Sequence, residues 1–153
     1  MRNFLKYWLP VFVWMAVIFG ASADSHSHER SASIVKPLLR WLFPHMSESE
    51  IETIHTLLRK CCHLTEYAIL GLLVFRALRH SRTGLPPWSW PRVGGTLLIV
   101  FLYASSDEYH QSFVPGRQAL FSDVCIDTGG GAIGLLAAWI VHSFRKPKPE
   151  NKK

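Results

Sequence analysis

The sequence predicts an all-α protein, a four-span transmembrane helical bundle with a short amphipathic helix in its first outer loop. Nearly half of the residues (48%) are hydrophobic and only 18% are charged, and the two kinds lie in separate blocks. Four apolar runs approach the ~20 residues that a helix needs to cross about 30 Å of hydrocarbon. We expect a single membrane domain over residues 1–145 and a disordered cytoplasmic tail over 146–153.

The expected spans cover residues 4–23, 59–78, 91–109 and 123–144. Pro91 suits the first turn of a helix, where its missing N–H has no hydrogen bond to lose. The first span has a second interpretation, because its basic start, apolar stretch and small residues at 21–23 also resemble a cleaved secretory signal peptide. An uncleaved first span gives the more consistent topology for the whole chain.

Basic residues predict how the chain crosses the membrane. The net charge of +6 would suggest a nucleic-acid partner in a soluble protein. Here, however, Lys and Arg lie at span ends, and no aromatic–basic interleaving of a nucleic-acid module is present. Segments 1–6, 76–92 and 145–153 are basic, whereas 107–123 is acidic. By the positive-inside rule, both termini should be cytoplasmic in a multi-pass protein of the cell membrane, with the lipid bilayer as its partner and no nucleic acid.

The first connection, residues 24–58, should therefore lie outside. Within it, the segment 34–43 places apolar residues around two basic ones, as expected of a short helix lying in the headgroup zone. Pro44 should end that helix. Ser47 and Glu50 have the spacing of a capping box, and a helix that begins there can continue into the second span.

The second span should place charged groups within the membrane or at its interface. Its uninterrupted apolar part, residues 67–78, would cover only roughly 18 Å, so the preceding turns must complete the crossing. Lys60, His63 and Tyr67 are spaced i, i+3 and i+7 and share one face of the helix, with Glu66 nearby. Ionisable residues at such a depth usually face the interior of a bundle and have partners.

The third and fourth spans can supply these partners. Asp107 and Gln111 lie one turn apart at the outer end of the third span, with Glu108 beside them. Asp123 begins the fourth span, and Asp127 follows on the same face. All of these groups should lie at the same outer level as Lys60.

Two further patterns complete this region. Pro115-Gly116 is a strong turn signal between the third and fourth spans, and it would bring Arg117 over the acidic groups. Gly130 and Gly134 have the small-xxx-small spacing that lets membrane helices approach closely.

These residues carry a resemblance to VanZ-like family membrane proteins, which covers most of the chain and includes the serine-bearing end of the first span. The matching motifs are Lys60-x-x-His63-x-x-x-Tyr67, Asp107-Glu108-x-x-Gln111-x-Phe113-x-Pro115-Gly116-Arg117 and Asp123-x-x-x-Asp127-x-x-Gly130-x-x-x-Gly134. The resemblance implies a bacterial origin and a cell-envelope task, because the family's namesake is linked to low-level resistance to teicoplanin, a glycopeptide antibiotic. Two departures are Asp127, where the family often has Asn, and residues 118–120, where Gly and Ser are common.

The resulting hypothesis is an outward-facing site for an amphiphilic envelope molecule, such as a lipid-linked, phosphate-bearing or sugar-bearing cell-wall precursor. The candidate acid–base residues are His63, Asp107, Glu108 and Asp127, and the candidate substrate-binding residues are Lys60, Tyr67, Gln111, Arg117 and Asp123. Three alternatives stay open: a binding or transport role without catalysis, a divalent metal held by the carboxylates, and an ion-pair network that only fixes helix packing. The sequence leaves both the cofactor and the oligomeric state open.

Overall fold

The structure, a computed structural model, describes residues 2–23, 27–80, 86, 88–114 and 119–144. These residues form five α-helices and no strand, which confirms the predicted all-α class. The helices are α1 (Arg2–Ala23), α2 (Ser27–Leu42), α3 (Glu48–Arg79), α4 (Trp90–Gln111) and α5 (Phe121–Phe144). Arg117 and the tail after residue 144 lie outside the described residues, so the predictions made for them are not addressed by the structure.

Three of the described helices are long and apolar enough to cross a membrane: α1 over Phe4–Ser22, α3 and α5. Helix α4 has 22 residues and would extend about 33 Å, which is sufficient length for a crossing. It is not among these three apolar segments, and it carries Arg92, Asp107 and Glu108. The four-span count therefore stays a prediction.

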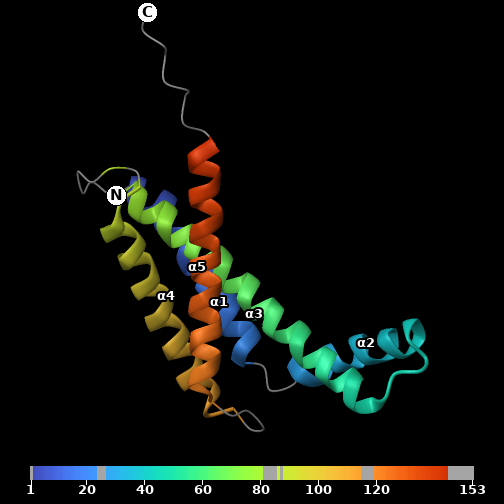
Figure 1. The fold of residues 1–153 in the computed structure, drawn as a ribbon. Helices are drawn as coiled ribbons and strands as arrows, with labels where there is room; N and C mark the ends of the chain where they lie inside the picture. The colour runs from blue at the N-terminus through green and yellow to red at the C-terminus, as the bar shows by residue number, and fades with distance from the viewer. Residues whose placement is uncertain (1, 24–26, 81–85, 87, 115–118, 145–153) are drawn as a thin grey trace, which may run out of the picture.

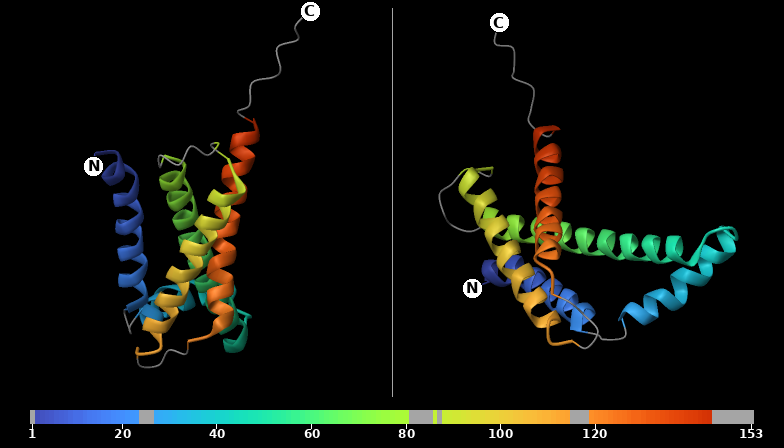
Figure 2. Two further views of the ribbon diagram at one scale, coloured as in Figure 1. Left: turned by 90° about the vertical axis from the view of Figure 1, so that its left-hand side faces the viewer. Right: turned by 60° about the horizontal axis from the view of Figure 1, so that its bottom comes forward.

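Four of the helices, α1, α3, α4 and α5, run alongside one another, while α2 and the first part of α3 extend to one side (Figures 1 and 2). The start of α1 and the end of α5 lie at the same end of this bundle. Tyr7 of α1 also stacks on His80 just after α3, with ring centroids 4.0 Å apart. At the opposite end, α1 and α4 finish and α5 begins (Figure 2).

Helix α3 is much longer than the span expected at 59–78. It starts after Ser47, whose side chain accepts a hydrogen bond from the Glu50 N–H at 3.3 Å, while the Glu50 carboxylate accepts one from the Ser47 N–H at 2.8 Å. This capping box was predicted from the sequence, as was a helix running from it into the span, and both are confirmed. With 32 residues, α3 extends about 48 Å, which exceeds the thickness of a bilayer core.

Helix α2 confirms the expected helix in the first connection, although it begins earlier, at Ser27, and ends at Leu42. It packs on the start of α3 through charged contacts. Arg40 donates two hydrogen bonds to the Glu48 carboxylate, at 3.0 and 2.7 Å, and Lys36 pairs with Glu52. Several large apolar side chains of this region remain exposed, namely Ile34, Leu38, Trp41, Leu42 and Phe43. A position in the headgroup zone stays a prediction.

The core lies where the four aligned helices meet, and it is built from apolar residues of each of them: Val11, Ile18, Tyr67, Leu70, Val74, Ala77, Val100, Ala104 and Val124. The contact between α3 and α5 is the most extensive. A Cβ added at Gly130 would collide with the backbone oxygen of Leu64, and one added at Gly134 would collide with that of Ala68. The predicted small-xxx-small contact is therefore present, and only glycine allows it.

Candidate functional site: a polar cluster at one end of the bundle

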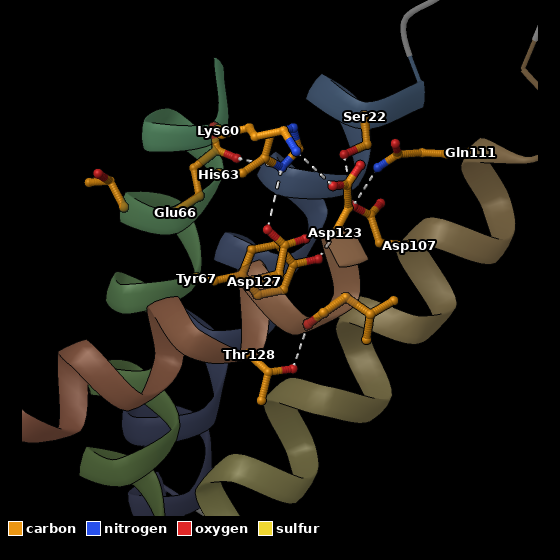
Figure 3. Close-up of polar contacts among 12 residues, drawn as sticks. Ser22, Lys60, His63, Glu66, Tyr67, Asp107, Gln111, Asp123, Asp127 and Thr128 are labelled. Carbon is orange, nitrogen blue, oxygen red and sulfur yellow. Dashed lines mark hydrogen bonds and ion pairs between the residues drawn. The ribbon is translucent and has the colours of Figure 1, made fainter. Parts of the chain in front are cut away.

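Polar side chains from four helices converge where α1 and α4 end and α5 begins (Figure 3). We call this group the polar cluster. It consists of Ser22, Lys60, His63, Glu66, Tyr67, Asp107, Glu108, Gln111, Asp123 and Asp127. Of the site residues predicted from the sequence, the structure brings together all except Arg117, which lies outside the described residues. These residues come together because α1 and α4 end, and α5 begins, at the same end of the bundle (Figure 2).

Asp107 lies at the centre of the cluster and is 1% exposed. Its Oδ2 accepts hydrogen bonds from the Ser22 hydroxyl at 2.9 Å, the Tyr67 hydroxyl at 3.3 Å and the Gln111 amide at 3.0 Å. Its Oδ1 is buried and accepts no hydrogen bond from the part of the chain that the structure describes. Half of this carboxylate is therefore satisfied by three donors, while the other half lacks a donor.

His63 lies between two carboxylates. Its Nδ1 is 3.9 Å from Asp127 Oδ1 on α5 and 3.9 Å from Glu66 Oε2 on its own helix. Both distances exceed a hydrogen bond, so these contacts are electrostatic in the present geometry. The Asp127 carboxylate is buried, whereas His63 and Glu66 are partly accessible. Both carboxylates face the same ring nitrogen, so His63, Glu66 and Asp127 form a compact group of titratable side chains.

Lys60, Glu108 and Asp123 contact other parts of the chain. Lys60 Nζ is 3.3 Å from Asp123 Oδ1, at the more exposed rim of the cluster. The Glu108 carboxylate is buried and accepts a hydrogen bond from the Leu120 N–H at 2.9 Å, just before α5 begins. These two contacts join α3 to α5 and α4 to the start of α5. Such contacts between helices are of the kind that the helix-packing alternative predicted for the charged residues.

Helix α1 contributes contacts that sequence patterns did not reveal. Besides Ser22, the Trp14 indole donates a hydrogen bond to the Glu66 carbonyl at 2.9 Å, and the Tyr103 hydroxyl donates one to the Met15 carbonyl at 2.5 Å. In the sequence, the small residues 21–23 chiefly indicate a candidate signal-peptide cleavage site. The one hint of another role for Ser22 was the serine-bearing end of the first span in the family resemblance.

The donor set does not support the metal alternative. Within the described residues, no group of three or more His, Cys, Asp and Glu side chains is close enough to hold a metal ion. Three of the carboxylates have separate partners: Asp107 accepts from its own donors, Asp123 pairs with Lys60, and Glu108 accepts from the Leu120 N–H.

A pocket of about 250 Å³ opens beside the polar cluster, between α1, α2 and α3. We call it the side pocket. Ser22, His63 and Glu66 of the polar cluster form part of its wall, and Ala21, Val35 and Leu58 give it an apolar wall. The pocket thus joins an apolar surface to titratable groups within one space.

Comparison with protein families shows where this arrangement belongs. The model of the VanZ/LLP1 family matches residues 7–142, which include every residue of the polar cluster. Neither the curated proteins nor the solved structures gave a match. Because the family model matches most of its length, the chain belongs to the VanZ/LLP1 family.

Proposed function

We propose that the polar cluster and the side pocket bind the headgroup of an amphiphilic cell-envelope molecule at the outer face of the membrane. The observation that carries this proposal is the side pocket, which joins apolar residues to His63, Glu66 and Ser22. Small-molecule sites are typically concave and mostly apolar, with a few convergent polar groups. A lipid-linked molecule has the same division between chain and headgroup.

The chemistry of the cluster indicates what the headgroup should carry. Asp107 Oδ1 is a buried acceptor to which none of the described residues donates, and such an atom favours a ligand hydroxyl or ammonium. A phosphate would need cations. Arg59 lines the side pocket, and Lys60 lies next to it in the chain, although Lys60 already pairs with Asp123. A headgroup that bears both a phosphate and hydroxyls, such as a sugar phosphate on a lipid, matches both kinds of group.

The charges at the two ends of the bundle support an outward-facing site. Lys6 near the start of α1 and Arg76 and Arg79 near the end of α3 all lie at the end opposite to the polar cluster. With basic residues facing the cytoplasm, as the positive-inside rule requires, the cluster faces outward and α4 forms a fourth span. Teicoplanin acts on the outer cell wall, so the family's link to this antibiotic agrees with that direction.

Ligand binding by the purified full-length protein in lipid nanodiscs tests the proposal. The probes are a polyprenyl phosphate, the same lipid carrying a sugar, and the uncharged polyprenol, with binding followed by native mass spectrometry. We expect the sugar phosphate to bind best and Asp107→Asn to weaken it about tenfold or more, because hydrogen bonds to charged groups contribute about 1.5–3 kcal/mol. Ser106→Ala is the matched control, since the Ser106 side chain is exposed and its hydroxyl donates to the Tyr103 carbonyl of the same helix.

Equal binding of all three lipids by the wild-type protein, or unchanged binding by a folded Asp107→Asn variant, would contradict the proposal. In that case the polar cluster fixes helix packing, as the contacts of Glu108 and Asp123 do. Survival on teicoplanin of a susceptible bacterium that expresses either variant provides an independent reading in cells. We expect protection by the wild type and Ser106→Ala, and its loss with Asp107→Asn.

A further inference from the structure

A second group of reactive side chains lies on the other side of the side pocket, where α2 packs on α3. The Ser31 hydroxyl of α2 is 2.9 Å from His55 Nε2 of α3. On the opposite edge of the same ring, His55 Nδ1 is 3.8 Å from Glu52 Oε1. His55 is 1% exposed, so its imidazole is held almost entirely within the protein.

The order of these three groups matters chemically. A hydroxyl on one ring nitrogen and a carboxylate on the other is the arrangement that turns serine into a nucleophile, and it recurs on unrelated folds. The distance from His55 to Glu52 exceeds a hydrogen bond, but such contacts are often long before a substrate binds. Lys36 pairs with Glu52 Oε2 and thereby leaves Oε1 turned toward the ring.

Access to the side pocket gives this triad a place for a substrate. Ser31 and His55 both line the pocket, together with Val35 and Leu58. Arg59 follows His55 by one helical turn and lines the same space. An acyl chain can lie against the apolar wall, while the guanidinium of Arg59 attracts negative charge that develops on a carbonyl oxygen beside Ser31.

We propose that Ser31, His55 and Glu52 form a hydrolytic site that cleaves carboxylic esters of amphiphiles entering the side pocket. Ser31 Oγ attacks the ester carbonyl carbon while His55 Nε2 takes the hydroxyl proton. The carbon–oxygen bond to the alcohol breaks, and His55 returns the proton to the departing alcohol. Water then attacks the acyl-serine, with His55 again as the base, and releases the carboxylic acid and the free Ser31 hydroxyl. Glu52 orients the ring and stabilises its protonated form.

This activity goes beyond the proposed function and does not depend on it. The two sites share the side pocket, but none of the three residues belongs to the polar cluster. If the polar cluster does not bind a headgroup, the ester hydrolysis can still take place. The variants that test the two proposals are also different, so that each can fail separately.

The test is covalent labelling of the full-length protein in lipid nanodiscs with an alkyl fluorophosphonate, whose phosphorus is attacked by activated serines. Mass spectrometry of the digested protein locates the label, and hydrolysis of p-nitrophenyl octanoate measures turnover. We expect the label on Ser31, with at least about tenfold slower labelling and turnover in Glu52→Gln and His55→Gln and none in Ser31→Ala. Ser33→Ala is the matched control, because Ser33 lies on the same helix and its exposed hydroxyl donates to the Arg30 carbonyl.

Several outcomes would overturn this proposal. They are the absence of label on Ser31, labelling of Ser31 and Ser33 at equal rates, and labelling of Ser31 that is unaffected by Glu52→Gln. Because His55 is buried, its replacement can disrupt the packing of α2 on α3. In that case Glu52→Gln alone tests the proposal, since the Glu52 side chain is 46% exposed and its replacement should not disturb packing. Ser106→Ala should label like the wild type, because Ser106 is exposed and lies in neither site. Headgroup binding is measured with different variants, so a failure here is distinguishable from a failure of headgroup binding.

Discussion

The Asp107 carboxylate is buried, and its two oxygens differ in their hydrogen bonds. One oxygen accepts from three donors, whereas the other accepts from none of the described residues. A buried charge costs free energy that its hydrogen bonds only partly offset. We therefore expect Asp107→Asn to raise the free energy of unfolding by about 1 kcal/mol while it weakens ligand binding, because functional groups are often retained at a cost in stability. Thermal unfolding in detergent measures this. A lower stability of Asp107→Asn than of Ser106→Ala would show that the negative charge serves packing.

Ser22 provides the opposite case at the residue scale. Its hydroxyl is buried and donates to Asp107 at 2.9 Å, so Ser22→Ala takes a donor from a buried carboxylate. We expect this variant to lose about 1–3 kcal/mol of unfolding free energy. The double variant with Asp107→Asn should lose less, because the neutral amide has a smaller need for donors. Strictly additive losses in this double-mutant cycle would show that the two side chains are not coupled.

The sequence predicted much of the site at this scale but not its partnerships. The i, i+3, i+7 spacing placed Lys60, His63 and Tyr67 on one face, and the pattern of spans placed the carboxylates at the same level. That Ser22 and Tyr67 both reach Asp107 depends on how three helices pack, which no local spacing encodes. The Ser31–His55 contact was missed for the same reason, because the two residues belong to different helices.

At the scale of the elements, the crossing of α3 and α5 is the feature that tolerates change least. A Cβ at Gly134 would meet the backbone of Ala68, which cannot move aside as a flexible side chain can. We expect Gly134→Ala to lose about 1–3 kcal/mol or more by forcing the helices apart. Gly129→Ala is the control, because its Cβ would meet nothing within 4 Å, and alanine should favour the helix. Equal thermal stability of the two variants would contradict this account of the crossing.

The capping box makes a separate prediction for the start of α3. Ser47→Ala removes the side chain that accepts the Glu50 N–H, which should cost about 1 kcal/mol locally. Hydrogen exchange should accelerate in the first turn of α3 and leave the polar cluster unchanged. Faster exchange throughout α3 would show instead that the helix unfolds as one unit.

The elements themselves were predictable to different degrees. The apolar runs and the capping box identified α1, α5 and the start of α3, because these signals are local. The early start of α2 at Ser27 was not predicted, since its first two turns are polar and lack the apolar periodicity by which a helix is recognised.

For the whole molecule, the four-span topology can be tested with single cysteines in a variant that lacks Cys61, Cys62 and Cys125. A membrane-impermeant maleimide applied to intact cells should label Ser49→Cys and Ser112→Cys, near the outer end. Trp90→Cys and Ser143→Cys, both at exposed positions, should react only after the cells are opened. Labelling of Trp90→Cys from outside would show that α4 does not cross the membrane.

The polar character of α4 has a consequence for how the protein is made. In the proposed four-span topology, α4 enters the membrane carrying Asp107 and Glu108. The transfer of such charged groups into hydrocarbon costs free energy. Ser22 and Tyr67, which donate to Asp107, belong to helices that the ribosome synthesises earlier. The Leu120 N–H that meets Glu108 is synthesised later. Integration of α4 should then be cooperative. Helices α1 and α3, already inserted, provide donors for Asp107, and α5 completes the bundle after α4 has inserted.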